Sequence, residues 1–397
     1  MISRAAPARY LYVWAGDRDE QHSDFLAVVD VRPESPTYGD VVATEPVGMR
    51  GSMPHHLEYE LPPPGTLLFA NAHHREQVLL FDTDDAARPR LVRTLSPPAP
   101  FRYPHDFVRL PNGNVLVGFL RSEGPSPLPG DTTLPGGHGG LAEVDPEGRL
   151  LRTSSAADSS ISEPIRTYAF AVLPETDRLL TTGARMMEAH SAHVVQVWRL
   201  SDLALLRTLR VPPARLPSGE TMRFGHWLPF EPRVMPDGSV LLNSYGCGFY
   251  RVTGMETPEP EIENVYTIPE SDGSGCGVPA VVGRFWVMTV AYGHKLISLD
   301  ITDPTRPVEV SRLRSDTTFR PHWLAKDPGS DRLIVGAEEN GGEHRMLMAR
   351  IDPATGRLSW DESFRSGDGS LGVSFRRESW PHGETGEAFG HSALFRP

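Results

Sequence analysis

The sequence predicts an all-β protein, a seven-bladed β-propeller, on three observations. Glycine and proline number 37 and 38 among the 397 residues. Both disfavour long helices, because proline removes a backbone donor and glycine raises the entropy lost on folding. Short β-rich runs recur along the whole chain in groups of four, separated by turn residues. The groups repeat at a period of about 50 residues, and four-strand units of fixed period are typical of a propeller.

Six complete four-strand units can be followed along the chain. The turn after the first strand repeats its chemistry, as Leu-Pro-Asn-Gly at 110–113, Met-Pro-Asp-Gly at 235–238 and Asp-Pro-Gly-Ser at 327–330. Proline sets φ in such turns, and glycine or asparagine adopts the positive φ that a hairpin needs. The units span residues 56–95, 105–154, 168–211, 231–269, 278–313 and 322–360.

The two ends of the chain supply the seventh unit. The N-terminal runs YLYVWAG, DFLAVVDV and DVVATEPV match the second, third and fourth strands of a blade, and the C-terminal HSALFRP matches the first. Closing the ring with strands from both termini removes the exposed sheet edges that an open ring would leave. We therefore expect residues 1–397 to form one propeller domain; the alternative is a two-domain β-sandwich.

Composition restricts the partners and the compartment. The net charge of -12 argues against nucleic acid and anionic membranes as partners, since both require a basic surface. No apolar run is long enough to cross a bilayer, and the N-terminus shows no apolar signal segment, so we expect a cytoplasmic protein. Two cysteines cannot build a disulfide framework, and no CxxC motif occurs. Any metal would therefore depend on histidines and carboxylates.

Four histidines share one position in the repeat, six residues before a proline. In a propeller the first strand of each blade lines the central channel, and these histidines begin that strand in four neighbouring blades. Histidine makes up only 15 of the 397 residues, so four such matches by chance are improbable. The four are His56, His105, His322 and His391.

Imidazole nitrogens that converge on one axis suit a divalent transition metal, here Fe(II) or copper. Four neutral histidines leave coordination positions open for dioxygen, water or a substrate heteroatom. The alternative is that these histidines bind channel water or cap strand ends. Tyr168, Phe230 and Cys276 occupy the equivalent position in the three other blades.

Residues near these strand starts are candidates for the substrate pocket and for orienting the ligands. The predicted pocket residues are Tyr168, His226, Trp227, Phe230, Cys276 and Trp323, with core packing or a structural turn as the alternative. The predicted carboxylate partners of the histidines are Glu338, Glu339 and Asp106, with surface charge as the alternative. Strand alternation should point His55, the neighbour of His56, away from the channel. The HxxH at 190–193 is expected to be a solvated loop.

Several stretches resemble the selenium-binding protein and methanethiol oxidase family. They include DFLAVVDVRPESPTYGDVV at 24–42, YPHDFVRLPNGNVLVGFL at 103–120 and LDITDPTRPVEVSRL at 299–313. The resemblance implies a seven-bladed propeller and, as in bacterial members, copper-dependent oxidation of methanethiol. It also implies that His56 and His105 match family histidines.

The chain departs from that family at three places. LEYELPPPG replaces the cysteine pair after the His-His motif, Val108 replaces a second histidine, and Arg377-Glu378 replaces a His-Glu pair. The chain therefore lacks the residues for thiol or selenium chemistry through that cysteine pair. Locally, AFGHSALF at 388–395 and PHDF at 104–107 are similar to carotenoid cleavage oxygenases, propellers with a four-histidine Fe(II) site.

Together these observations predict a metal-dependent oxidase or oxygenase that acts on a small molecule, with dioxygen as a candidate co-substrate. One alternative is a non-redox lyase, isomerase or hydrolase that uses the metal as a Lewis acid. Another is a non-catalytic propeller that binds a partner. The sequence does not choose iron over copper, and it identifies neither the substrate nor the oligomeric state.

Overall fold

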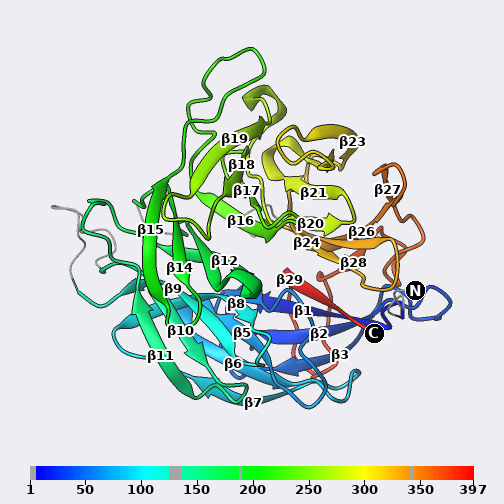
Figure 1. The fold of residues 1–397 in the computed structure, drawn as a ribbon. Helices are drawn as coiled ribbons and strands as arrows, with labels where there is room; N and C mark the ends of the chain where they lie inside the picture. Colours follow the sequence, from blue (N-terminus) through cyan, green and yellow to red (C-terminus); the bar gives the residue numbers. More distant parts are fainter. Residues whose placement is uncertain (1–5, 125–135, 187–189, 339–343) are drawn as a thin grey trace. The chain divides into compact units, whose positions relative to one another are not determined.

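Short antiparallel strands make up nearly all of the regular structure (Figure 1). The computed structural model describes residues 6–124, 136–186, 190–338 and 344–397. Within these ranges the strands form seven antiparallel sheets, and the only helices are four 3-10 turns, none long or apolar enough to span a bilayer. Six sheets have four strands and one has a fifth, which confirms the predicted four-strand units.

The described chain divides into two compact units. The first unit comprises residues up to 94, then 277–302 and 308–397, and the second comprises residues 95–276 and 303–307. The first unit contains four sheets and the second contains three. The prediction of one domain over residues 1–397 stays a prediction.

The sheets of the first unit follow the chain in order, apart from the strand that the C-terminus adds. One sheet holds β29 (Ala388–Arg396), β1 (Tyr10–Asp17), β2 (Phe25–Asp30) and β3 (Val41–Pro46). The next holds β4 (Pro54–Leu57), β5 (Leu68–Ala72), β6 (Gln77–Asp82) and β7 (Arg90–Leu95). A third holds β20 (Ala280–Val282), β21 (Phe285–Val290), β22 (Lys295–Asp300) and β23 (Val308–Arg314). The fourth holds β24 (Pro321–Lys326), β25 (Arg332–Ala337), β26 (Arg345–Ile351) and β27 (Leu358–Trp360), with β28 (Val373–Ser374) also paired to β26.

The second unit repeats the same arrangement three times. Its first sheet holds β8 (Phe101–Arg109), β9 (Val115–Ser122), β10 (Gly140–Val144) and β11 (Leu150–Ser155). Its second holds β12 (Thr167–Leu173), β13 (Arg178–Gly183), β14 (Val194–Arg199) and β15 (Ala204–Arg210). Its third holds β16 (Pro229–Val234), β17 (Val240–Ser244), β18 (Gly248–Thr253) and β19 (Glu261–Thr267).

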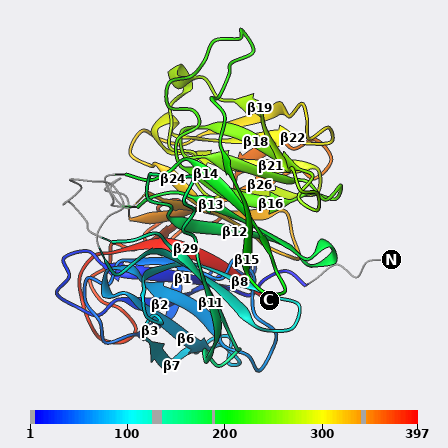
Figure 2. The same cartoon turned by 60° about the vertical axis from the view of Figure 1, so that its left-hand side comes forward.

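The C-terminal strand completes the N-terminal sheet, as predicted. β29 pairs antiparallel with β1, with Val13 opposite Ala393. Figures 1 and 2 show the red C-terminal strand beside the blue N-terminal one from two directions. β29 therefore covers the edge of β1 that would otherwise be unpaired, and the N-terminal sheet exposes no free edge there.

Burial follows the order of the strands within a sheet. The second and third strands are buried on both faces, so β2 and β5 are almost continuously apolar. The fourth strands are partly exposed, and in β23 exposed and partly buried residues alternate along the strand. This pattern is expected where sheets pack on both faces and only the outer strand meets water.

The predicted hairpin turns form with the expected backbone geometry. Gly113 and Gly238 have φ of 88° and 80°, and their N–H groups donate to the carbonyls of Leu110 and Met235. A side chain at either glycine would strain the turn, because L residues rarely adopt this φ. The turn chemistry therefore fixes where the first strand of each of these sheets ends.

The two cysteines form a disulfide, which the sequence analysis did not anticipate. Cys247 follows β17 and Cys276 precedes β20, so the bridge closes a loop over a separation of 29 residues within the second unit. Both residues are buried. Disulfides are more usual outside the reducing cytoplasm. The cytoplasmic location stays a prediction.

Removing this bridge is expected to destabilise the protein. Replacing both cysteines with serine should lower the free energy of unfolding by about 3–4 kcal/mol, because the unfolded chain regains the entropy of an open loop. Urea unfolding with and without a thiol reductant measures this. The reductant should destabilise the natural protein and leave the double variant unchanged; equal stability of all four samples would contradict the bridge.

Candidate metal site

A β-bulge interrupts the first strand of six of the seven described sheets at the predicted ligand position. The pairing register shifts at these places, so extra residues oppose one partner residue on the second strand. Bulges redirect side chains and are common beside active sites. The residues at the first bulge position are His55, His105, Tyr168, Phe230, His322 and His391.

This register adds a second candidate, His55, in one blade, and the assignment of His56 as a ligand stays a prediction. His55 follows Pro54 as His105 follows Pro104 and His322 follows Pro321, so His55 is the residue equivalent to the other two. In the sequence, the recurring Pro-His dipeptide marks this equivalence. The six-residue spacing to the proline of the following turn instead selected His56. His56 occupies the second bulge position.

Polar side chains on the second strands hold the bulges in place. Asn71 Oδ1 accepts from the backbone N–H of His56 at 2.8 Å and of His55 at 3.2 Å. Thr289 Oγ1 donates to the carbonyl of His322 at 3.0 Å, and Asn243 donates to that of Cys276 at 2.9 Å. These contacts satisfy backbone groups that the bulge removes from the strand ladder. The position of Cys276 at a strand start equivalent to that of the histidines stays a prediction.

Four buried histidines of the first unit lie together. The ring centroid of His391 lies 4.0 Å from that of His55, 5.1 Å from that of His322 and 6.1 Å from that of His56. The rings of His55 and His56 are stacked at 4.5 Å, and one nitrogen of each lies within 4.8 Å of the other. Alternation, from which His55 was predicted to point away from the channel, does not hold here, because both residues lie in the bulge. The structure thus brings together three predicted ligands, His56, His322 and His391, and adds His55.

The hydrogen bonds of these rings select the nitrogen that can bind a metal. His391 Nδ1 donates to the carbonyl of His55 at 2.7 Å, and His322 Nδ1 lies 3.2 Å from the carboxylate of Glu338. In the second unit, His105 Nδ1 donates to the carbonyl of Tyr168 at 2.9 Å. Since the two carbonyl oxygens accept, Nδ1 carries the proton in the neutral rings of His391 and His105, and Nε2 presents the lone pair. This is the usual arrangement of a histidine that ligates a metal.

Burial keeps the ring of His391 in its neutral form. Removal from water, with a further contribution from His322, lowers the pKa of His391 to about 3. A neutral imidazole is the species that coordinates a metal. The site therefore needs no proton release from His391 at neutral pH before it can bind an ion.

Among the predicted carboxylates, Glu338 lies against a predicted ligand. It follows β25 and faces His322 Nδ1. Replacing Glu338 with Gln should lower metal affinity by about 10- to 100-fold, because the negative charge that raises the basicity of the imidazole is lost. Competition with a chelator measures this, with Glu362→Gln, an exposed position of the same unit, as the control. Equal affinity of Glu338→Gln and the natural protein would exclude the role.

Of the other two predicted carboxylates, Asp106 and Glu339, the structure describes only Asp106. Asp106 is fully buried beside His105, and its Oδ1 accepts from the N–H of Phe107 at 2.9 Å. Burial and the nearby Glu231 raise its pKa. Its orienting role stays a prediction. Glu339 lies outside the described residues.

Aromatic rings border the histidines in both units, as predicted. Trp323 is fully buried, with its ring 5.2 Å from that of His56, and its Nε1 donates to the carbonyl of Ala393 at 3.0 Å. In the second unit the ring of Tyr168 lies 3.9 Å from that of His105 and 4.4 Å from that of Phe230. A pocket role for Trp323, Tyr168 and Phe230 stays a prediction that this packing favours.

The remaining predicted pocket residues lie apart from this stack in the second unit. Trp227 stacks on His193 at 5.4 Å, and the ring of His226 meets that of His193 edge-on at 5.6 Å. In the HxxH, His190 is exposed as predicted, whereas His193 is half-buried, and this burial lowers its pKa to about 4. Cys276 forms the disulfide and offers no free thiol to a substrate.

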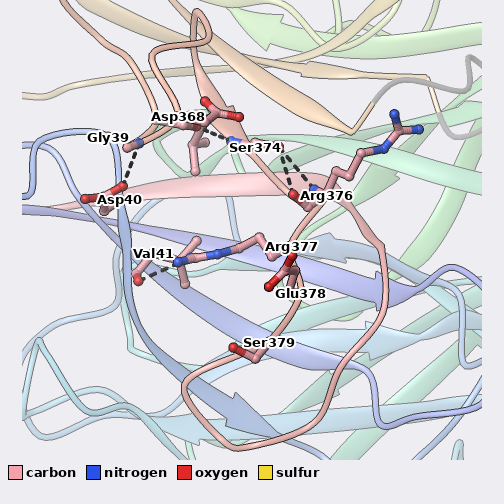
Figure 3. A pocket seen from close by; sticks show the side chains of 12 residues that line it. Gly39, Asp40, Val41, Asp368, Ser374, Arg376, Arg377, Glu378 and Ser379 are labelled. Carbon is pink, nitrogen blue, oxygen red and sulfur yellow. Dashed lines mark hydrogen bonds between the residues drawn. The ribbon is translucent and has the colours of Figure 1, made fainter.

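A separate polar cavity of about 330 Å³ lies in the first unit (Figure 3). It lies between residues 39–41 and the loops at 366–379, where Arg377 donates to the carbonyl of Val41 at 3.4 Å. Figure 3 shows Glu378 beside Arg377, so the two residues that replace the family's His-Glu pair line this cavity. None of the predicted metal ligands or pocket residues is among the described residues that line it.

Comparison with known proteins agrees with the resemblance predicted from the sequence. No protein-family model matches the chain. Methanethiol oxidase from Hyphomicrobium sp is 32% identical over 231 residues, which cover 52% of this chain and 49% of that protein. The match thus spans about half the length of this curated relative.

Solved structures show the fold. The X-ray structure of a hypothetical selenium-binding protein from Sulfolobus tokodaii has a TM-score of 0.77 at 15% identity and covers 98% of this chain and 94% of that chain. A periplasmic gluconolactonase from Pseudomonas aeruginosa has a TM-score of 0.61 at 16% identity and covers 88% of this chain and 94% of that one. With the seven sheets, these likenesses confirm the seven-bladed β-propeller class.

Proposed function

We propose that the protein is a metal-dependent oxidase of a small molecule, with one iron or copper ion held by histidines of the bulges. The observation that carries the proposal is the cluster of buried histidines in the first unit, two of which direct Nδ1 at an oxygen. His55, His322 and His391 are the proposed ligands there, with His56 beside them. His105 occupies the equivalent position in its own strand, and its assignment as a ligand stays a prediction.

The donor set fits such an ion. Imidazole suits iron, copper and zinc, and a set without a carboxylate among the ligands keeps the charge of the ion available to a bound substrate. Orientation of the rings by carbonyl and carboxylate oxygens is the support that ligating histidines usually receive. When bound, the ion would exchange electrons between the substrate and dioxygen.

The chain's own residues would position and protect this chemistry. His391 keeps its proton on Nδ1, because the carbonyl of His55 accepts there, and the carboxylate of Glu338 lies 3.2 Å from His322 Nδ1. The buried indole of Trp323 excludes water on the side of His56. Water exclusion strengthens electrostatic interactions and limits side reactions.

We propose a small sulfur compound such as an alkanethiol as the substrate class. The curated relative bears the name methanethiol oxidase, and aromatic side chains beside the histidines suit a small apolar substrate. The family's cysteine pair is absent, so the thiol would meet the metal site and not a protein disulfide.

Metal loading combined with oxygen consumption tests the proposal. Metal-free protein without a His tag is loaded anaerobically with Fe(II), copper or zinc, and dioxygen uptake is followed with methanethiol, a longer thiol and methanol. Stoichiometric binding with thiol-dependent uptake for iron or copper supports an oxidase. Tight binding of zinc alone, without dioxygen uptake under any metal, would favour the Lewis-acid alternative. Failure to bind any of the three would leave a binding propeller.

A further inference from the structure

Tyr59 lies against the histidine cluster of the first unit, and it belongs neither to the proposed ligands nor to the predicted pocket residues. It follows β4 three residues after His56, and its hydroxyl lies 3.4 Å from His56 Nδ1. Its ring is parallel to that of Trp323, with 5.4 Å between centroids and 4° between planes. Trp323 directly follows His322, so this phenol and this indole each adjoin a candidate ligand.

The number of electrons transferred in an oxidase reaction indicates a role for a tyrosine in this position. An oxidase removes two electrons from its substrate and passes both to dioxygen. A single iron or copper ion usually changes its charge by one electron at a time. A second one-electron carrier next to the ion therefore allows both electrons to leave the substrate without releasing a substrate radical. A phenol can serve, because it loses one electron and one proton to become a phenoxyl radical.

We infer that Tyr59 is this second carrier, an inference that rests on the oxidase function proposed above. In the oxidised state, the metal site lacks one electron, and Tyr59 lacks one electron and one proton and is a phenoxyl radical. The substrate then supplies two electrons and two protons: Tyr59 takes one electron and one proton, the metal site takes the other electron, and water takes the other proton. Dioxygen then accepts one electron from each of the two carriers, with the Tyr59 proton and one proton from water, which gives hydrogen peroxide and restores the oxidised state.

Three features of the site suit Tyr59 to this role. With its proton on Nδ1, His56 donates to the phenol oxygen, and this hydrogen bond stabilises the phenoxyl form. The stacked indole of Trp323 spreads the unpaired electron and shields one face of the ring. Tyr59 is only partly buried, so its proton can reach water, whereas the ring of Tyr168 in the second unit is fully buried.

Electron paramagnetic resonance of the metal-loaded protein tests the inference directly. Protein with its metal content measured is treated with a stoichiometric one-electron oxidant such as hexachloroiridate and frozen at once. The natural protein should give a narrow organic-radical signal whose hyperfine pattern collapses when tyrosine is replaced by ring-deuterated tyrosine. In Y59F this signal should fall to background with the metal content unchanged, and in W323F it should decay faster.

Two control variants separate Tyr59 from other tyrosines. Y38F removes the hydroxyl that bonds Asp361 in the same unit, and the signal should persist. Y168F removes the phenol stacked on His105, and the signal should persist there as well. A signal that survives in Y59F, disappears in Y168F or is absent from loaded natural protein would overturn the inference. Loss of metal binding by the natural protein would instead refute the proposed function, and the metal analysis distinguishes the two failures.

Discussion

The double variant His322→Ala/His391→Ala is expected to bind no iron or copper under conditions where the natural protein binds one equivalent. Two ligand nitrogens are removed, and the neighbouring acceptors, Glu338 and the carbonyl of His55, lose the rings that they orient. Loss of one orienting contact already costs about 10- to 100-fold in metal affinity, and loss of two ligands should exceed this. Elemental analysis after equilibration with a weak chelator measures the effect, and thiol-dependent dioxygen uptake should disappear with the metal.

Single variants resolve which residue acts in the blade of β4. His55→Ala should weaken metal binding more than His56→Ala, because His55 occupies the bulge position equivalent to His322 and His391. His74→Ala, an exposed histidine in the same unit, is the matched control and should bind metal normally. The reverse order of effects would restore the assignment from proline spacing. Full metal content in the double variant would refute the site.

The second large effect is expected at a buried ion pair, where Asp327→Ala should lower the free energy of unfolding by about 3–5 kcal/mol. Asp327 and Arg332 are both buried, and Arg332 Nη2 donates to Asp327 Oδ2 at 2.7 Å. Arg332 also donates to the carbonyl of Val31 and, at 3.2 Å, to that of Ala8. Asp327 Oδ1 accepts from the N–H of Ala8 at 3.1 Å. The pair thus attaches the N-terminal segment to the turn between β24 and β25, and alanine would leave the guanidinium buried without its carboxylate.

The nearby Asp352 supplies a matched control. Its carboxylate also caps a turn in the same sheet, accepting from Ala354 N–H and Thr355 Oγ1, but it is exposed and contacts no arginine in the described structure. Asp352→Ala should therefore cost about 1 kcal/mol or less. Urea unfolding at neutral pH compares the two variants; equal losses would mean that the buried charge pair adds nothing to the turn.

The pH dependence of this pair follows from its hydrogen bonds. Burial would raise the pKa of Asp327, but hydrogen bonds from Ser330 and Arg332 outweigh it and hold the pKa below its usual value. A carboxyl group with a lowered folded-state pKa stabilises the fold above its unfolded pKa, and the stabilisation is lost as pH falls through the folded value. The difference in stability between the natural protein and Asp327→Ala should therefore be full at neutral pH and shrink in acid, in unfolding curves recorded over that range.

The fold could be predicted from the chain because propeller blades are local in sequence. Each blade is a meander of consecutive strands, so apolar runs and Pro-Gly turns such as 110–113 and 235–238 mark it without long-range information. The seventh sheet was also predictable, because β1–β3 lacked a first strand and the C-terminus had a spare one. The disulfide was not predictable, since Cys247 and Cys276 are 29 residues apart and only the fold brings them together.

The sequence by itself determined which residue types could hold a metal: histidines at the start of first strands, with Glu338 near one of them. Only the tertiary structure decided which ring nitrogens make hydrogen bonds and that His55 lies beside the predicted histidines. A bulge depends on backbone pairing with the next strand and on residues there such as Asn71. Within a bulge, side chains no longer alternate between the two faces of the strand, so the argument that left His55 out of the predicted ligands does not apply. Tyr59 likewise meets Trp323 only after folding, because 264 residues separate them and ring stacking depends on the packing of two blades.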